Sequence, residues 1–518
     1  MMKTVKNAIG REVPSFVEGI GELKAFQGAY NCEPEGVKHA TKLPRAFKGG
    51  NKVLSDLKES LIKCGIKDGM TLSFHHHFRN GDFLVNQVMD EVAEMGIKDI
   101  TIFASSLQGV HKPLIEHIKN GVVTGIETSG IRGELGEAIT KDGILKKPVI
   151  IRSHGGRPRS IAAGETKIDI AFLAAPAADP YGNVNGVEGP TACGSMGYAM
   201  ADAEYAEKVV VVTDYLVDYP ATPISIPQTL VDYVVKVEKI GDPAGIVSGA
   251  TRITKNPLEL MIAEEASKAV IASGLVKEGF SFQAGTGGPS LAVAHFLRKK
   301  MIQDGIKGSF AAGGTTGYLV DMLNEGLFKT LLDVQCFDLK AVESIKTNPN
   351  HVEMSADFYA NPHNKGCAAN QLDIMILSAT EIDVDFNVNV ITGSNGVIMG
   401  ASGGHCDTAA GAKLSIVVAP LLRGRLPIIV DEVTTVITPG ETIDAVVTER
   451  GVAVNPARKD LEEKFRTAGL NVMSMEELKA IAENLTGKPE KIKTSDEIVG
   501  LVEYRDGTII DVIRRVVE

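Results

Sequence analysis

A glycine-rich loop, GTGGPS at positions 285–290, is the segment best suited to hold an anion. It follows the apolar run GFSF and precedes a segment in which Val293, Phe296, Leu297 and Met301 repeat with helical spacing, so it joins a strand to a helix. Glycines allow backbone N–H groups to approach a ligand, and the helix N-terminus adds a partial positive charge. The loop therefore predicts a site for a carboxylate, a phosphate or a developing oxyanion. The alternative is a tight turn without a ligand, because the sequence matches neither G-x-G-x-x-G nor a Walker A loop.

A second loop, HHHFRNGD at positions 75–82, follows the apolar run TLSF. Three histidines suggest a metal site, but consecutive side chains of a strand point to opposite faces, so only alternate ones could share an ion. Histidine and arginine facing an acid suit the segment better. We predict no metal here and keep a solvated polar loop as the alternative.

Further glycine-rich and basic segments could contribute to the same site. GASGGHCD, at 400–407, places His405, Cys406 and Asp407 next to each other, which is poor spacing for a Cys-His dyad. We expect a turn that faces a substrate. TSGIRG, SHGGR and RGR could add cations through Arg132, His154, Arg157, Arg423 and Arg425, or could be surface loops.

These segments recur because the chain contains one unit twice. IDIAFLAAPAADPYGNVN (168–185) resembles LDIMILSATEIDVDFNVN (372–389), with Asp169 and Asp373 at the same offset as Asn183 and Asn387. The two loops described first also follow equivalent runs, and CGSMG (193–197) corresponds to GASGG (400–404). A unit of about 200 residues is too long for a solenoid repeat, so each copy should have its own core.

Each copy alternates short Ile- and Val-rich runs with amphipathic segments, a pattern typical of a parallel sheet covered by helices. We predict an α/β fold of two tandem open domains at residues 51–235 and 236–518, after an N-terminal arm over residues 1–50. A hairpin around Asp506-Gly507 should end the second domain. Ligands of such sheets bind at the carboxyl ends of strands.

Composition excludes several classes of partner. With a net charge of −11, the 518-residue chain does not suit nucleic acid or anionic membranes. No apolar run approaches the roughly 20 residues of a membrane span, and residues 1–14 lack a signal-like apolar stretch. Six scattered cysteines without a C-x-x-C pair fit reduced thiols, so we expect a cytoplasmic protein.

Several motifs together resemble the citrate lyase alpha subunit family. They run in order from about residue 50 to the C-terminus: SFHHHFRNGD, ETSGIRGEL, SHGGR, FQAGTGGPSLAV, DVQCFD, NPNHVE, FNVNVITGSNGVIMGASGGHCDTA, VAPLLRGRLP and GVAVNPAR. The resemblance implies a citrate CoA-transferase with two CoA-transferase-type α/β domains. Such an enzyme exchanges acetyl for citryl on the phosphopantetheine-type thioester arm of an acyl carrier protein and releases acetate. It also implies a beta lyase subunit as partner, a homo-oligomer, and no cofactor bound by this chain.

One departure from the wider CoA-transferase group bears on the mechanism. Where many members carry a nucleophilic glutamate, this chain has Ala311, Ala312, Gly313 and Gly314. Citrate itself should then attack the acetyl thioester to form a mixed anhydride. Glu381 is the best replacement if a glutamate nucleophile exists.

Such a reaction needs groups that orient a tricarboxylate and donors for an oxyanion. For the catalytic role we predict His76, Gly287 and Gly288. For substrate binding we predict Ser73, His75, His76, Arg79, Gly285, Thr286, Gly287, Gly288, Asn389, Gly403, Gly404 and His405. A structural role is favoured for Asn183 and Asn185, whereas the equivalent pair Asn387 and Asn389 could be structural or bind citrate.

Two other functions remain open on the same scaffold. A thioester hydrolase would need an activated water and a base. A sugar-phosphate isomerase or a non-catalytic binding protein would usually be a single copy of about 200–250 residues.

Overall fold

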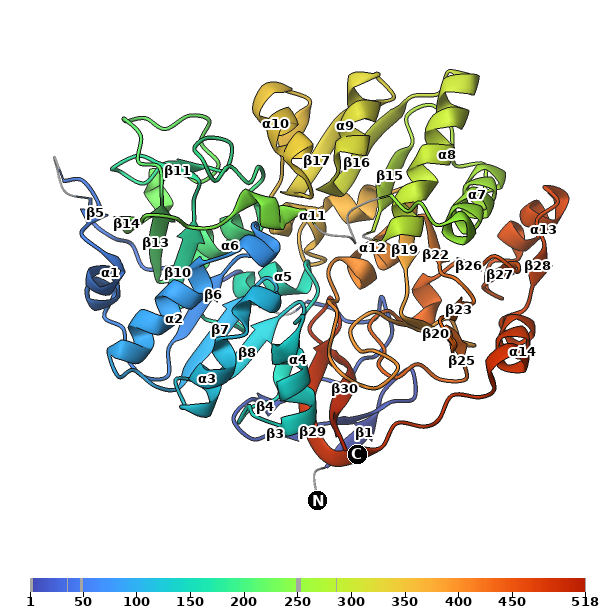
Figure 1. Cartoon of the computed structure of the whole chain (residues 1–518), viewed down its shortest axis with the longest axis horizontal. Helices are drawn as coiled ribbons and strands as arrows, with labels where there is room; N and C mark the ends of the chain where they lie inside the picture. Colours follow the sequence, from blue (N-terminus) through green and yellow to red (C-terminus); the bar gives the residue numbers. More distant parts are fainter. Residues whose placement is uncertain (1–2, 35, 47–49, 248–252, 286, 518) are drawn as a thin grey trace.

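The computed structural model of the chain describes residues 3–34, 36–46, 50–247, 253–285 and 287–517. It contains two large, mainly parallel sheets that lie side by side with helices on both faces (Figure 1). Among these residues, no helix is long and apolar enough to cross a membrane.

The first sheet has ten strands, and only the two C-terminal strands, Thr494–Glu503 and Ile509–Val516, pair antiparallel. In spatial order the strands are β30 (Ile509–Val516), β29 (Thr494–Glu503), β9 (Val149–Ile151), β8 (Val123–Thr128), β7 (Ile100–Ala104), β6 (Thr71–Phe74), β10 (Ile170–Ala174), β13 (Lys208–Thr213), β14 (Tyr233–Lys236) and β5 (Val53–Leu54). Its helices are α1 (Leu57–Cys64), α2 (Leu84–Glu94), α3 (Leu114–Lys119), α4 (Glu134–Glu137), α5 (Gly156–Ala162) and α6 (Gly197–Tyr205).

The second sheet has nine strands, and only β26 and β27 pair antiparallel. The order is β18 (His351–Glu353), β17 (Phe328–Cys336), β16 (Gly308–Thr315), β15 (Ser281–Ala284), β19 (Ile374–Ser378), β22 (Leu414–Val418), β26 (Ala445–Val447), β27 (Val452–Val454) and β28 (Val472–Met473). Its helices are α7 (Pro257–Ala272), α8 (Gly288–Asp304), α9 (Gly317–Asn324), α10 (Leu339–Thr347), α11 (Ala356–Ala360), α12 (His405–Gly411), α13 (Lys459–Thr467) and α14 (Met475–Thr486).

The duplication is visible in the strand order. The run β9-β8-β7-β6-β10-β13-β14 of the first sheet has the same connectivity as β18-β17-β16-β15-β19-β22-β26 of the second. In both copies an aspartate side chain accepts the first backbone N–H of the central strand, at 2.9 Å: Asp169 from Thr71 and Asp373 from Ser281. The two-domain α/β fold that the sequence predicts is therefore confirmed.

Burial explains why these segments form. The run KVVVVT of β13 is buried from Val209 to Thr213, as expected for a strand covered on both faces. On α2, the predicted apolar stripe of Val85, Val88, Met89 and Val92 is buried against the sheet.

The C-terminal hairpin does not belong to the sheet where we expected it. β29 and β30 do pair antiparallel around Asp506-Gly507, but β29 joins β9 of the first sheet in parallel register. In Figure 1 the red hairpin lies beside α4 of the first half. The predicted boundary after residue 235 falls inside β14, and the domain limits otherwise stay a prediction.

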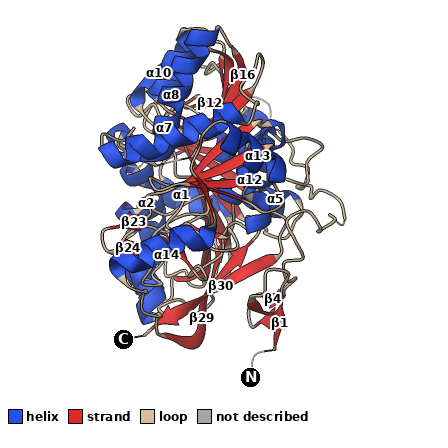
Figure 2. Ribbon diagram, turned by 90° about the vertical axis from the view of Figure 1, so that its right-hand side faces the viewer, coloured by secondary structure: helices blue, strands red, loops and turns tan. Residues whose placement is uncertain are grey.

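The N-terminal arm packs on this hairpin. Strands β1 (Thr4–Lys6) and β2 (Glu12–Pro14) pair, as do β3 (Phe16–Val17) and β4 (Gly21–Glu22), and Val13 and Val17 share a small core with Leu501. Both chain ends consequently lie at the same end of the molecule (Figure 2).

Candidate active site between the two halves

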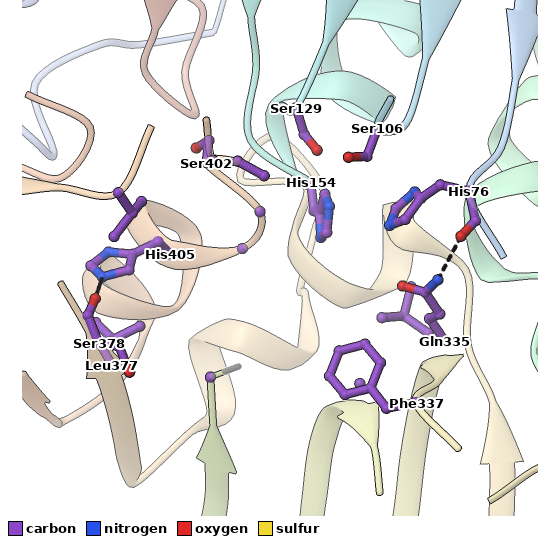
Figure 3. A pocket seen from close by; sticks show the side chains of 18 of the residues that line it. His76, Ser106, Ser129, His154, Gln335, Phe337, Leu377, Ser378, Ser402 and His405 are labelled. Carbon is purple, nitrogen blue, oxygen red and sulfur yellow. Dashed lines mark hydrogen bonds between the residues drawn. The ribbon is translucent and has the colours of Figure 1, made fainter. Parts of the chain in front are cut away.

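A cavity of about 400 Å³ opens between the two halves. First-half residues at the carboxyl ends of β6, β7 and β8 line it, including His76, Ser106 and Ser129 (Figure 3). Gly285 and Gln335 come from the ends of β15 and β17 in the second half. This is the edge at which open α/β sheets bind ligands, and the volume lies within the roughly 300–1,000 Å³ of small-molecule sites.

The charge of the cavity is positive. Arg79, Arg132 and Arg423 line it, whereas no carboxylate does among the described lining residues. Burial, and then the nearby Arg132, lower the pKa of Arg79 to about 10, and burial lowers the pKa of Arg132. Arg132 Nε has no hydrogen-bond partner among the described residues. An anionic ligand would offset this repulsion and desolvation.

Arg79 is also held in an unusual conformation. Its φ is +54°, in the left-handed region that non-glycine residues seldom adopt, and its guanidinium lies 5.5 Å from the centre of the Phe337 ring. Such backbone strain is found most often at functional sites.

His76 is the one member of the histidine run that lines the cavity. Its backbone N–H donates to Ser105 Oγ at 3.0 Å, and its Nδ1 lies 2.6 Å from the same oxygen. We assign the Ser105 hydroxyl as the donor to Nδ1, which places the proton of the neutral ring on Nε2. Burial, and then His154 and Arg79, lower the pKa of His76 well below its ordinary value, so this donor is uncharged.

The structure does not bring the neighbouring residues Ser73, His75 and His77 to the cavity. All three are buried behind it. His75 Nδ1 lies 3.6 Å from Asp202, and burial lowers the pKa of both flanking histidines. The predicted contacts of Ser73 and His75 with a substrate are therefore not supported by their positions.

Two aromatic rings complete this side of the cavity. Tyr198, at the start of α6, stacks on His76 with ring centres 4.7 Å apart, and its hydroxyl lies 2.8 Å from His154 Nδ1. We expected His154 as a cation, but burial, and then Arg157 and Arg79, lower its pKa to about 3, so the ring is neutral.

Tyr198 was not predicted from the sequence, although the duplication contains a signal for it. The alignment of CGSMG with GASGG pairs Tyr198 with His405, and both residues line the cavity from the start of a helix.

The GTGGPS loop contributes less than expected. Gly285 lines the cavity, but its N–H donates to Ile376 O at 2.7 Å within the sheet. Gly287 and Gly288 begin α8 and do not line the cavity, and Thr286 lies outside the described residues. Gly287 has a φ of +126°, and a Cβ there would lie 2.5 Å from Ser378 Oγ, so the turn itself requires glycine.

The GASGGHCD turn does line the cavity, with Gly403, Gly404 and His405. His405 Nε2 lies 3.0 Å from the carbonyl oxygen of Ser378 and must donate to it, and Nδ1 lies 2.7 Å from Thr438 Oγ1. Both ring nitrogens are thus used, and His405 presents only ring carbons to a ligand.

Glu381 and Asn389 lie apart from the cavity. Asn389 is fully buried and donates to Glu381 Oε2 at 3.0 Å, and the same oxygen accepts the backbone N–H of Thr434. Asn387 bonds Asp383 just as Asn183 bonds Asp179 in the first copy. These asparagines therefore form the same turn twice, and the predicted substrate contact of Asn389 is not supported.

One group of potential metal ligands is present among the described residues: Asp333, Cys336 and His351. Their side chains bond one another, with Asp333 Oδ2 at 3.0 Å from the Cys336 sulfur and 3.1 Å from His351 Nε2. Asp333 also accepts the backbone N–H of Gln335, whose side chain donates to the His76 carbonyl across the halves. The group fixes the end of β17 beside the cavity.

Comparison with known proteins gives a consistent result. Residues 50–516 match the family model described as citrate lyase, alpha subunit (CitF). The citrate lyase alpha chain of Klebsiella pneumoniae is 54% identical over 469 residues, which cover 90% of this chain and 92% of that one. A Streptococcus mutans structure, described as the alpha subunit of citrate lyase in complex with citrate, has a TM-score of 0.95 at 54% identity and covers 99% of this chain and 100% of that chain.

More distant structures share the fold alone. A 4-hydroxybutyrate CoA-transferase from Porphyromonas gingivalis has a TM-score of 0.54 at 18% identity and covers 84% of this chain and 96% of that chain. The fold is thus of the CoA-transferase type, as the sequence predicted.

Proposed function

The chain belongs to the citrate lyase alpha subunit family, and on this premise we propose that its central cavity binds citrate and exchanges acetyl for citryl on a thioester. The observation that carries the proposal is a cavity with three arginines and no carboxylate among its described lining residues. Three cations suit a tricarboxylate, because each guanidinium can hold one carboxylate through two parallel hydrogen bonds. The citrate named in the Streptococcus mutans structure supports the same ligand.

The attacking group is a carboxylate of citrate. Of the four residues that stand where a nucleophilic glutamate is expected, Gly314 lines the cavity, and a Cβ there would lie 2.0 Å from a Phe337 ring carbon. A larger side chain has no room at this position. Glu381, the alternative nucleophile, is buried outside the cavity and accepts two hydrogen bonds.

The reaction then takes two steps, and neither step requires the transfer of a proton. The citrate carboxylate attacks the acetyl thioester carbonyl, so that a C–O bond forms, the C–S bond breaks, and a citrate-acetate mixed anhydride and a thiolate result. The thiolate attacks the citryl carbonyl, the C–S bond forms again, and acetate leaves. Both steps develop negative charge on a carbonyl oxygen, which His76 Nε2–H is placed to stabilise.

The thioester belongs to the phosphopantetheine-type arm of an acyl carrier protein, or to CoA, and the chain binds no cofactor of its own. A beta subunit that cleaves the citryl thioester is the second partner, within a citrate lyase complex in which this chain forms a homo-oligomer. The family membership supports these assignments.

A thioester hydrolase on the same scaffold would need a base for water. No carboxylate lines the described part of the cavity. His76 and His154 have their Nδ1 atoms in hydrogen bonds with Ser105 and Tyr198, so neither presents a free basic nitrogen to a water in the assigned tautomers. These observations favour transfer over hydrolysis.

The deciding experiment supplies the purified chain with acetylated carrier protein and labelled citrate. The label should move to the carrier, with one acetate released for each citryl group transferred. Acetate release at the same rate without citrate would contradict the proposal in favour of hydrolysis.

A further inference from the structure

The loop after β9 brings His154 to the cavity from the first half, and the second half holds this loop in place. The His154 backbone N–H donates to Gly403 O at 2.7 Å. On either side, Ser153 Oγ and the Gly155 N–H donate to the two oxygens of Asp407, at 2.8 and 2.9 Å. Three successive residues of the first half are thus bonded to the GASGGHCD turn and α12.

Packing leaves this loop little freedom. A Cβ at Gly155 would lie 2.1 Å from Ala360 O and 2.6 Å from Asp407 Oδ1. Asp407 is fully buried, and Arg505 of the C-terminal hairpin approaches it to 3.7 Å. Asp407 therefore lies where both halves and the hairpin meet, with His154 next to it.

The proton of the His154 ring is placed by Tyr198. The ring is neutral, and burial raises the pKa of Tyr198 well above its ordinary value, so the phenol keeps its hydrogen. The Tyr198 hydroxyl has no other hydrogen-bond partner among the described residues, so we assign it as the donor to His154 Nδ1. The ring proton is then on Nε2, and the ring lies at the cavity beside His76 (Figure 3).

We infer that His154 is a catalytic residue whose Nε2–H donates to the carbonyl oxygen of the thioester and of the mixed anhydride as negative charge develops there. Tyr198 and Asp407 are positioning residues, the first for the tautomer and the second for the loop. The inference rests on the proposed function, because that carbonyl is present only if a thioester enters the cavity. A neutral donor suits a developing oxyanion better than it suits a carboxylate of citrate, and the cavity is lined by three arginines that suit the carboxylates.

The test compares His154→Phe, which keeps a ring but has no donor, with His154→Gln, whose amide N–H can take the place of Nε2–H. Loss of one oxyanion donor typically costs about 100-fold or more in kcat. We expect that loss in His154→Phe, with the calorimetric Kd of citrate within about threefold of the parent, and recovery of at least tenfold in His154→Gln. His117→Phe, on α3 away from the cavity, is the control and should behave as the parent.

Tyr198→Phe tests the tautomer without changing His154. If His154→Phe does not fold, Tyr198→Phe becomes the deciding variant. Its kcat should fall about tenfold with citrate affinity retained, because only the donor to Nδ1 is lost. A kcat within threefold of the parent in either variant would overturn the inference, and so would equal losses of kcat and citrate affinity. If the parent itself transfers no citryl group, the proposed function is wrong. If the parent is active and His154→Phe is equally active, the proposed function stands and only the role of His154 is wrong.

Discussion

Gly314 lies directly against the ring of Phe337: a Cβ at position 314 would approach a ring carbon to 2.0 Å. Gly314 is part of β16, and Phe337 follows the end of β17, the neighbouring strand. The ring therefore fills the space that a side chain at position 314 would occupy.

From this contact we expect Gly314→Glu to be destabilised by about 1–3 kcal/mol, as is usual when a packed site is overfilled. The double variant Gly314→Glu/Phe337→Ala should recover part of that loss, because the smaller side chain makes room. Urea unfolding measures both, and Gly366→Ala, at an exposed glycine with nothing within 4 Å of its Cβ, is the neutral control. Additive effects of the two changes would show that Phe337 does not occupy the space.

Trapping experiments should find no acylated glutamate on the parent chain. During turnover, hydroxylamine or borohydride followed by peptide mass spectrometry should leave every glutamate unmodified, because no carboxylate lines the described part of the cavity. A modified Glu381 would refute the mixed-anhydride route, and this residue would have to leave its hydrogen bonds to Asn389 and Thr434 to react.

Arg79→Ala should weaken citrate binding by about 10- to 100-fold, the range for loss of a charged hydrogen bond of roughly 1.5–3 kcal/mol. Arg79→Lys should restore only part of it, because an ammonium cannot hold a carboxylate through two parallel bonds. Calorimetry with citrate measures the effect. Arg298→Ala removes an arginine paired with Glu325 far from the cavity and should bind citrate as the parent does. Unchanged affinity in Arg79→Ala would remove this residue from the site.

The close contact between Gly130 of the first half and Ala401 of the second half gives a further test. A Cβ on Gly130 would lie 2.3 Å from the Cα of Ala401, with which Gly130 forms an isolated bridge. Gly130→Ala should separate the GASGGHCD turn from the first half and lower kcat at least tenfold, since displacements of about 1 Å at a site can cost about 100-fold. Gly366→Ala should keep full activity in the same assay. Parental kcat in Gly130→Ala would mean that the halves need not meet there.

The sequence predicted the architecture because the duplication repeats local patterns that each half needs for its own core. The buried stripe of α2 and the paired Asn turns both follow from nearby residues. The hairpin was assigned to the wrong sheet because its pairing with β9 joins residues about 350 positions apart, and nothing within the hairpin specifies that partner.

The site was harder to predict because it depends on contacts between the halves. Alternation along the chain separates His76 from His75 and His77, but it does not show which side faces the cavity, and the turn after β6 decides that His76 does. His405 was predicted to contact the substrate as part of the GASGGHCD turn, but Ser378 and Thr438, from other elements, use both of its ring nitrogens. His154 was noticed only as a cation, because its burial is a property of the assembled cavity.

Asp407 should make the stability of the fold depend on pH in a predictable direction. Burial raises its pKa to about 6, against the opposing effects of Arg505, Gly155 and Ser153, whereas an unfolded aspartate titrates near pH 3.9. Between these values the folded chain binds more protons at this group than the unfolded chain, so its contribution to the free energy of unfolding falls as the pH rises from about 4 to about 6. The parent should therefore gain stability relative to Asp407→Asn on acidification through this window.

Urea unfolding of both proteins at several pH values measures this difference, in which the other titrating groups cancel. Asp373→Asn is the control of opposite sign. Burial raises the pKa of Asp373, but Lys413 and the hydrogen bonds from Ser281 outweigh it and hold the pKa below its ordinary value. Its contribution is present above about pH 4 and is lost as the pH falls further. A difference in free energy of unfolding between the parent and Asp407→Asn that stays constant from pH 4 to 6 would contradict the raised pKa of Asp407. It would also contradict the interpretation that the buried carboxylate lowers stability near pH 6 while it holds the His154 loop through Ser153 and Gly155.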